Sequence, residues 1–347
     1  MILPQARLLR LGRASLLWRP RSAAVCAGLL LAVLLLALLL LGTGTLRLSP
    51  VQVIEGLAGL SSETTATRVL HAIRLPRLLT AGLVGAALGL AGAVFQSLSR
   101  NPLGSPDVIG FTTGAATGAI LQIILFNAGA FQVATAAVGS GLMTALMVLA
   151  LARGGREGYR LILTGIGIGA VLAGVNSMLL VMGNLDRAMS AQIWLAGSLN
   201  ARSWSHVWPA AAGLTLFLPV LAANARHLAV LEMGEDMAAQ LGVSIARSRT
   251  VLVVAAVGLT AVATASAGPI AFIALAGPQI ARRLTREPGV PLLSGALTGA
   301  VLVLAADLLS QRAPLGLLLP IGSMTGMCGG LYLVWVLARD GQKLRKK

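Results

Sequence analysis

Residue types that carry out chemistry are few in this chain and poorly placed for catalysis. The three histidines, His71, His206 and His227, lie far apart, and all three lysines fall at or beyond position 343. A phosphate-binding loop needs Gly-x4-Gly-Lys-Ser/Thr, which a chain with these lysines cannot form. Cys26 and Cys328 lie in the first and last apolar blocks and indicate neither a disulfide framework nor a metal cluster. We therefore expect no enzyme activity, no catalytic residue, no metal and no bound cofactor.

One charged segment does have an informative pattern. We call Leu231–Val243 the acidic insert; it lies in the longest basic-flanked loop, 226–249. Its apolar residues recur every four positions and predict one apolar face on a short helix, and Gly242 is a typical helix stop. Such a helix suits a groove on a partner protein, whereas a helix lying in the lipid interface favours Lys and Arg on its polar face. The acidic residues are Glu232, Glu235 and Asp236, and the apolar ones are Met233, Met237 and Leu241.

The rest of the chain is built for a membrane. Apolar residues make up 56% of the 347 positions and charged residues 11%, against roughly 25% charged in globular proteins. Charges are absent over eight long blocks, each able to hold one or two spans of about 20 residues. The blocks are 22–46, 78–99, 108–152, 161–185, 203–225, 250–281, 288–306 and 313–338. The pattern predicts an all-α polytopic membrane protein.

Two blocks are long enough to turn back on themselves. Asn127-Ala128-Gly129 supplies a turn inside 108–152, and Gly268-Pro269 supplies one inside 250–281, which has arginines at both ends. We therefore expect about ten transmembrane helices, the eighth being short. Glycines four residues apart, such as Gly85/Gly89 and Gly295/Gly299, predict close helix packing.

Charge placement fixes the expected orientation. With both termini in the cytoplasm, 20 of the 27 basic residues lie on the cytoplasmic side, as the positive-inside rule requires. The net charge of +16 therefore records topology and indicates no nucleic acid partner. We expect one transmembrane domain over 1–347, with a cytoplasmic tail at 1–22, a cytoplasmic loop at 226–249 and a basic tail at 339–347. The apolar stretch 22–46 is too long for a signal peptide.

The energy source for transport is missing from the chain. Ionisable groups within a membrane are costly and usually functional, and Asp307, near the end of its block, is the one candidate for an ion site. An ion-coupled secondary transporter is thus one alternative, and an interaction or assembly protein without transport is another. A conduit whose energy source resides in a different subunit fits the sequence better than either.

Several motifs resemble the permeases of ABC importers for iron-siderophore, haem and cobalamin, and most closely those for ferric enterobactin. They extend over nearly the whole chain. They are Arg74-Leu-Pro-Arg77 leading to Gly92-Ala-Val-Phe-Gln-Ser-Leu98, Arg100-Asn-Pro-Leu-Gly-Ser-Pro-Asp-Val-Ile-Gly110, the acidic insert, Gly268-Pro-Ile-Ala-Phe-Ile-Ala-Leu275, Ala306-Asp307 and Leu319-Pro-Ile-Gly322.

The resemblance implies a permease subunit in a bacterial inner membrane, working with two ABC ATPase subunits that use ATP and Mg. It also implies a substrate-binding protein outside, a ferric siderophore as cargo, and a second permease, identical or related. Cobalamin or haem are alternative cargoes. The coupling helix for the ATPase would comprise Glu232, Met233, Gly234, Glu235, Ala238, Leu241 and Gly242.

Two further sets of residues follow from the same resemblance. Docking of the binding protein falls to Arg74, Arg77 and Arg312, although anchoring to lipid headgroups is the alternative for them. The translocation pathway falls to the fifth and tenth spans, although helix packing is the alternative for each residue. The pathway residues are Thr164, Asn176, Ser177, Met178, Met182, Ser323, Thr325 and Met327.

Overall fold

The computed structural model describes residues 7–11, 14–60, 64–152, 158–286, 289–312 and 319–344. An antiparallel hairpin, β1 (Arg7–Leu11) and β2 (Ala14–Trp18), precedes a helical bundle. Its first helices are α1 (Pro20–Gly42), α2 (Pro50–Leu57), α3 (Thr64–Val69), the π-helical η1 (Leu70–Arg74), α4 (Leu75–Ser99), the 3-10 helix η2 (Pro106–Ile109), α5 (Phe111–Phe126) and α6 (Ala130–Leu151). The others are α7 (Gly158–Met182), α8 (Leu185–Leu195), α9 (Trp204–Ala223), α10 (Ala225–Glu232), α11 (Glu235–Gln240), α12 (Ile245–Ala267), α13 (Ile273–Thr285), α14 (Leu292–Gln311) and α15 (Ile321–Leu344).

Among the described residues, seven helices are long and apolar enough to cross a membrane: α1, α4, α6, α7, α9, α12 and α14. Helices α5, α13 and α15 occupy the other intervals in which the sequence predicts a span. The long block 250–281 does turn back, because α12 ends at Ala267 and α13 begins at Ile273. Between them Gly268 has a left-handed φ of 76° and Pro269 follows it, and both features end a helix.

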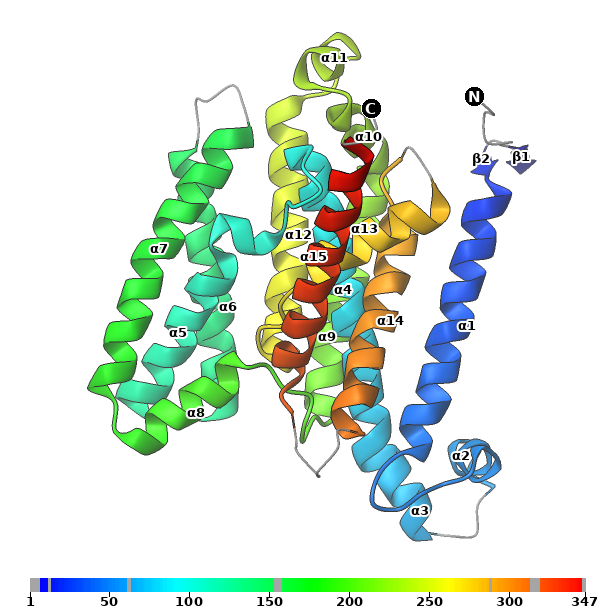
Figure 1. Cartoon of the computed structure of the whole chain (residues 1–347), viewed down its shortest axis with the longest axis vertical. Coiled ribbons are helices and arrows are strands. Elements are labelled where there is room, and N and C mark those ends of the chain that lie inside the picture. Colours follow the sequence, from blue (N-terminus) through cyan, green and yellow to red (C-terminus); the bar gives the residue numbers. More distant parts are fainter. Residues whose placement is uncertain are drawn as a thin grey trace.

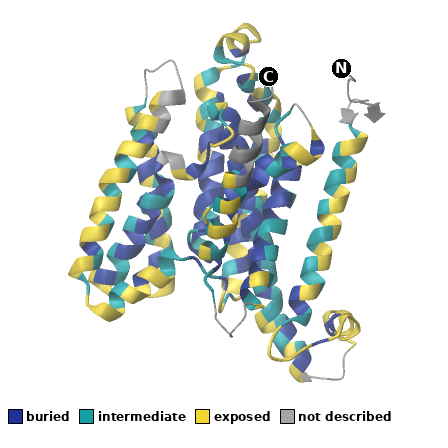
Figure 2. Cartoon of the chain, viewed as in Figure 1, coloured by how far each residue is buried: buried dark blue, intermediate teal, exposed yellow. Residues whose placement is uncertain are grey.

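Buried residues concentrate in the middle of the bundle, where α4 and α12 lie (Figure 2). In each of these two helices 72% of the apolar window is buried, against 11% in α1 and 6% in α7. Helix α4 packs against α12, α13 and α14, and α1 covers α14. The exposed sides of α1 and α7 are apolar, as expected of surfaces that meet lipid or another subunit.

The contact between α4 and α14 depends on facing glycines. A Cβ added at Gly89 would collide with the carbonyl oxygen of Gly295, and one at Gly299 would collide with that of Gly85. These are the glycine pairs whose spacing predicts close packing. The helix backbones therefore touch directly, without intervening side chains.

The two ends of the bundle differ (Figure 1). Helices α10 and α11 lie at the same end as the start of α1 and the end of α15, whereas α2, α3 and α8 lie at the opposite end. The acidic insert and the first turn of α4, which carries Arg77, are thus at opposite ends of the molecule; Arg74, the last residue of η1, directly precedes that turn.

We expect Gly89→Ala to lower the free energy of unfolding by about 1–3 kcal/mol, because its methyl group overpacks the α4–α14 contact. Gly82 is the matched control, since it lies in the same helix and a Cβ there meets nothing within 4 Å. Thermal unfolding in detergent measures both variants. Equal melting temperatures for the Gly89→Ala and Gly82→Ala proteins would contradict the packing account.

Candidate functional site

The acidic insert is not the single helix that the sequence predicts. Helix α10 ends at Glu232, the chain turns at Met233 and Gly234, and α11 begins at Glu235. Gly234 has φ 124° and ψ 154°, a conformation that side chains disfavour. A glycine within a short amphipathic pattern was the local sign of this break. Gly242, with φ 75°, follows α11 as predicted.

The apolar residues of the acidic insert project from the protein. The exposed fractions of Met233, Met237 and Leu241 are 72%, 49% and 61%. Ala238 differs from the expected coupling surface, because it is fully buried against the bundle core. The exposed methionines and leucine therefore form the surface available to a partner, and Ala238 anchors α11 beneath it.

The two glutamates of the insert bind the membrane helices. Glu232 accepts a hydrogen bond from Arg282 in α13, with a distance of 2.7 Å between Oε1 and Nη1. Glu235 accepts one from Arg249 in α12, with Oε1 2.6 Å from Nη2. The sequence predicts that these glutamates lie on the polar face of a helix, but it does not reveal their arginine partners. No sequence pattern joins residues 50 positions apart, as Glu232 and Arg282 are.

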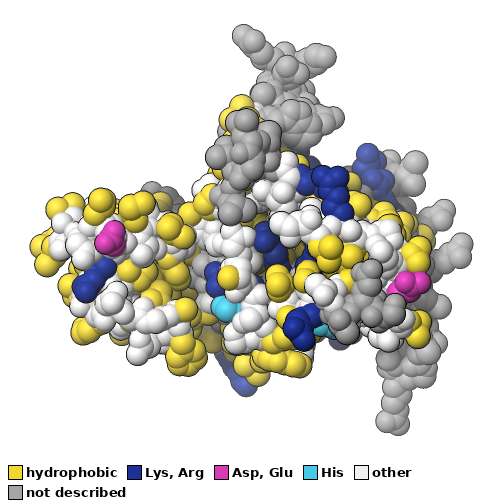
Figure 3. All heavy atoms as spheres, turned by 90° about the horizontal axis from the view of Figure 1, so that it is seen from below, with side chains coloured by type: hydrophobic (Ala, Val, Ile, Leu, Met, Phe, Trp, Pro, Cys, Tyr) yellow, Lys and Arg dark blue, Asp and Glu magenta, His cyan; other side chains and the backbone are white. Residues whose placement is uncertain are grey.

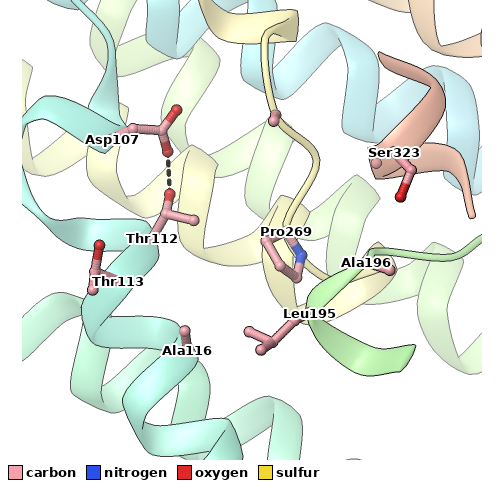
Figure 4. Close-up of a pocket in the computed structure, with 10 residues that line it drawn as sticks. Asp107, Thr112, Thr113, Ala116, Leu195, Ala196, Pro269 and Ser323 are labelled. Atoms are coloured by element: carbon pink, nitrogen blue, oxygen red, sulfur yellow. Dashed lines mark hydrogen bonds between the residues drawn. The ribbon is translucent and has the colours of Figure 1, made fainter. Parts of the chain in front are cut away.

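A cavity of about 450 Å³ lies within the bundle, between η2, α5, α8, the α12–α13 connection and α15. Asp107, Thr112 and Thr113 stand on one side of it, with Pro269 and Ser323 across from them (Figure 4). The Thr112 hydroxyl donates a hydrogen bond to the Asp107 carboxylate. Asp107 belongs to the motif Arg100–Gly110, but the sequence alone predicts no role for it.

The predicted pathway residues are not gathered at this cavity. Of the eight, Ser323 alone is among its lining residues. On α7, Met178 and Met182 are 66% and 62% exposed, and on α15 Met327 is 60% exposed. These side chains therefore face outward from the single chain.

Three of the remaining pathway residues donate hydrogen bonds to backbone carbonyls, two within their own helix and one to α5. Thr325 is buried, and its hydroxyl donates a hydrogen bond to the Gly322 carbonyl of α15. The Ser177 hydroxyl donates one to the Ala173 carbonyl of α7. Asn176 donates from Nδ2 to the Thr113 carbonyl at 3.4 Å. Thr164 is half-buried on α7. Their part in a pathway stays a prediction.

At the opposite end, Arg77 is held within the protein. Its Nη2 lies 2.6 Å from Oδ1 of Asp307, whose side chain is 1% exposed. The Arg77 Nη1 also donates to Asn200 at 2.9 Å, and Gln311 donates to Asp307 at 2.9 Å. Arg77 thus neutralises Asp307, the candidate ion site of the sequence analysis. The same ion pair connects α4 to α14.

Arg74 and Arg312 reach the end of α1. Arg74 donates to the carbonyl oxygens of Leu41 and Leu46, and Arg312 donates to the Thr43 hydroxyl at 3.3 Å. Within the described part of the chain, the acceptors of these two arginines are neutral and no carboxylate pairs with either charge. Seen from this end, basic side chains gather toward the middle of the face and acidic ones lie nearer its edges (Figure 3).

Comparison with known proteins identifies relatives along most of the chain. Residues 29–339 match the model of the FecCD transport family. The chain is 45% identical over 304 residues to the ferric enterobactin transport system permease protein FepG of Escherichia coli K12, covering 87% of this chain and 92% of that protein. It is 35% identical over 316 residues to the achromobactin transport system permease protein CbrC of Dickeya dadantii, covering 90% of each.

A solved structure has the same fold. An ABC transporter of the metal-chelate type, in an inward-facing conformation, superposes with a TM-score of 0.82 at 27% identity, covering 91% of this chain and 99% of that chain.

We expect Arg77→Gln to lower the free energy of unfolding by about 3–5 kcal/mol, because it leaves the Asp307 carboxylate buried without a cation. The double variant Arg77→Gln/Asp307→Asn removes both charges and should regain part of this loss. Arg47→Gln, at an exposed arginine of the same end, is the control. Thermal unfolding in detergent measures the stability of all three variants. An Arg77→Gln protein as stable as the Arg47→Gln control would contradict a stabilising role of the Arg77–Asp307 ion pair.

Proposed function

The chain belongs to the FecCD transport family, and we propose that it is the permease subunit of an ABC importer for a ferric siderophore. Relatives that share a third or more of its residues are named as permeases for ferric enterobactin, achromobactin and ferric citrate. Iron held by an organic chelator is common to these cargoes. The 45% identity to the ferric enterobactin permease favours an enterobactin-like chelate, with cobalamin or haem as the alternatives.

The observation that carries this proposal is the exposed apolar surface of the acidic insert, at the end of the bundle that holds most of the arginines. In an importer whose ATPase is a separate subunit, the permease must offer that subunit a surface at the cytoplasmic end. An apolar helix face fits a groove on a partner protein. Two ABC ATPase subunits, which use ATP and Mg, would bind here and at the second permease.

We place ten spans in the bacterial inner membrane, with both termini in the cytoplasm. Seven helices support this directly by length and hydropathy. The short helix α13 supports the hairpin, because Arg282 and Arg283 lie in its last turn, on the side where the positive-inside rule places basic groups. The chain would supply half of the translocation pathway, and the outward-facing methionines of α7 and α15 would meet the second permease. A related, non-identical partner is favoured over a second copy of this chain.

The opposite end would receive the substrate-binding protein. Arg74 and Arg312 are suited to this role, because no carboxylate among the residues that the structure describes pairs with them. Arg77 is less suited, since Asp307 already accepts its hydrogen bonds. In this proposal Arg77 shapes the docking face while Arg74 and Arg312 meet acidic groups of the partner.

We expect ATP-dependent accumulation of ferric enterobactin in proteoliposomes that contain the permease, its second permease, the ATPase and the binding protein. Collapse of the membrane potential should leave uptake unchanged, whereas omission of ATP should abolish it. The reverse pattern would instead support a secondary transporter. Absence of any accumulation would support an assembly protein, and ferric citrate in place of ferric enterobactin tests the choice of chelate.

We expect Met237→Glu to reduce co-purification of the ATPase with the permease at least tenfold, because it places a carboxylate in an apolar contact. The matched control is Met189→Glu, a methionine 56% exposed on α8 at the other end of the molecule. Quantitative pull-down from detergent measures both. If the two variants retain equal amounts of ATPase, the insert is not its binding surface.

A further inference from the structure

The acidic insert is fastened to the bundle at two points on two different helices. Glu232 is bound by Arg282 of α13, and Glu235 is bound by Arg249 of α12. Both ion pairs are partly buried, with side-chain exposures of 22% and 30% in the first and 25% and 27% in the second. Charge-assisted hydrogen bonds of this length are stronger and more directional than neutral ones.

The two ion pairs lie on opposite sides of the turn at Gly234. Glu232 is the last residue of α10, and Glu235 is the first of α11. Because Gly234 has a backbone conformation that allows the two helices to take different directions, each half of the insert needs its own attachment. Each half has one ion pair.

Arg282 also connects to the centre of the bundle. Its Nη1 donates to Glu232, while its Nη2 donates to the Ser97 hydroxyl of α4 at 2.8 Å. Arg282 therefore joins the insert to α13 and at once to α4, one of the two helices at the buried centre of the bundle. Arg249 lies in the second turn of α12, and α11 packs against that helix.

Helices α12 and α13 lead from the ion pairs to the cavity. They meet at the connection 268–272, in which Pro269 and Ala271 line the cavity together with Ser323 of α15. The last residue of α12, Ala267, accepts a hydrogen bond from the Ser198 amide at 2.8 Å, which fixes this connection to the segment after α8. A displacement of either helix at the insert would therefore move a wall of the cavity.

We propose that Arg249 and Arg282 are positioning residues for energy coupling: they hold the two halves of the acidic insert on α12 and α13, so that movement of the ATPase is transmitted to the cavity. This inference rests on the proposed function. The two ion pairs would transmit the movement, whereas the exposed apolar side chains of the insert would bind the ATPase.

The test is charge reversal and exchange in the complete reconstituted transporter. We expect Arg282→Glu and Glu232→Arg each to reduce uptake at least tenfold, while co-purification of the ATPase and the melting temperature stay close to wild type. The exchange Glu232→Arg/Arg282→Glu should restore uptake to within about threefold, because the Ser97 hydroxyl can donate to a carboxylate at 282. The single reversals Glu235→Arg and Arg249→Glu should each reduce uptake at least tenfold as well, and the exchange Glu235→Arg/Arg249→Glu should restore it to within about threefold.

The control is Arg247→Glu, which makes the same charge change two residues from Arg249 at an exposed position. It should leave uptake per ATP hydrolysed unchanged. Single reversals that fold, bind the ATPase and transport normally would overturn the proposal, as would exchanges no better than the single reversals. Failure of the proposed function is distinguishable, because the wild-type transporter would then show no ATP-dependent uptake.

Discussion

A bilayer cannot solvate charge, and this constraint governs the molecule. Apolar helices carry the chain across, and their backbones approach at glycines, as α4 and α14 do. The fully buried acid Asp307 is tolerated because Arg77 places a guanidinium 2.6 Å from it. Every other ion pair among the described residues lies at the opposite end, where water reaches it. The ion pairs among the described residues are thus confined to the two ends of the bundle.

That separation explains how a chain with few charged or potentially catalytic side chains can take part in transport. Its described residues offer surfaces and rigid elements, and in the proposed importer the energy comes from a separate ATPase subunit. The acidic insert presents methionine and leucine side chains outward while its glutamates bind α12 and α13. The connection between the end of α12 and the start of α13 lines a cavity that α5 and α15 also line. In the proposed importer, binding of the ATPase and transmission of its movement would therefore use different faces of one short segment.

Local signals in the sequence predicted much of this architecture. The turn at Gly268-Pro269 was predictable because helix stops depend on neighbouring residues. The periodicity of the apolar residues did not predict the break at Gly234, because a single glycine does not interrupt the pattern. The family resemblance placed Ala238 in the coupling helix, but a resemblance does not say which side chains of that helix are buried. Arg77 and Asp307 are 230 residues apart. Only the packing of α4 on α14 brings them together, so sequence reasoning assigned each a separate role.

The central claim is that the acidic insert contacts the ATPase, and photo-crosslinking tests it most directly. A photoreactive amino acid at position 237 should crosslink the permease to the ATPase subunit in native membranes, and more strongly when ATP is bound. The same group at position 189 should give no such product. Crosslinks from position 237 that go only to lipid, or equally from both positions, would contradict the account.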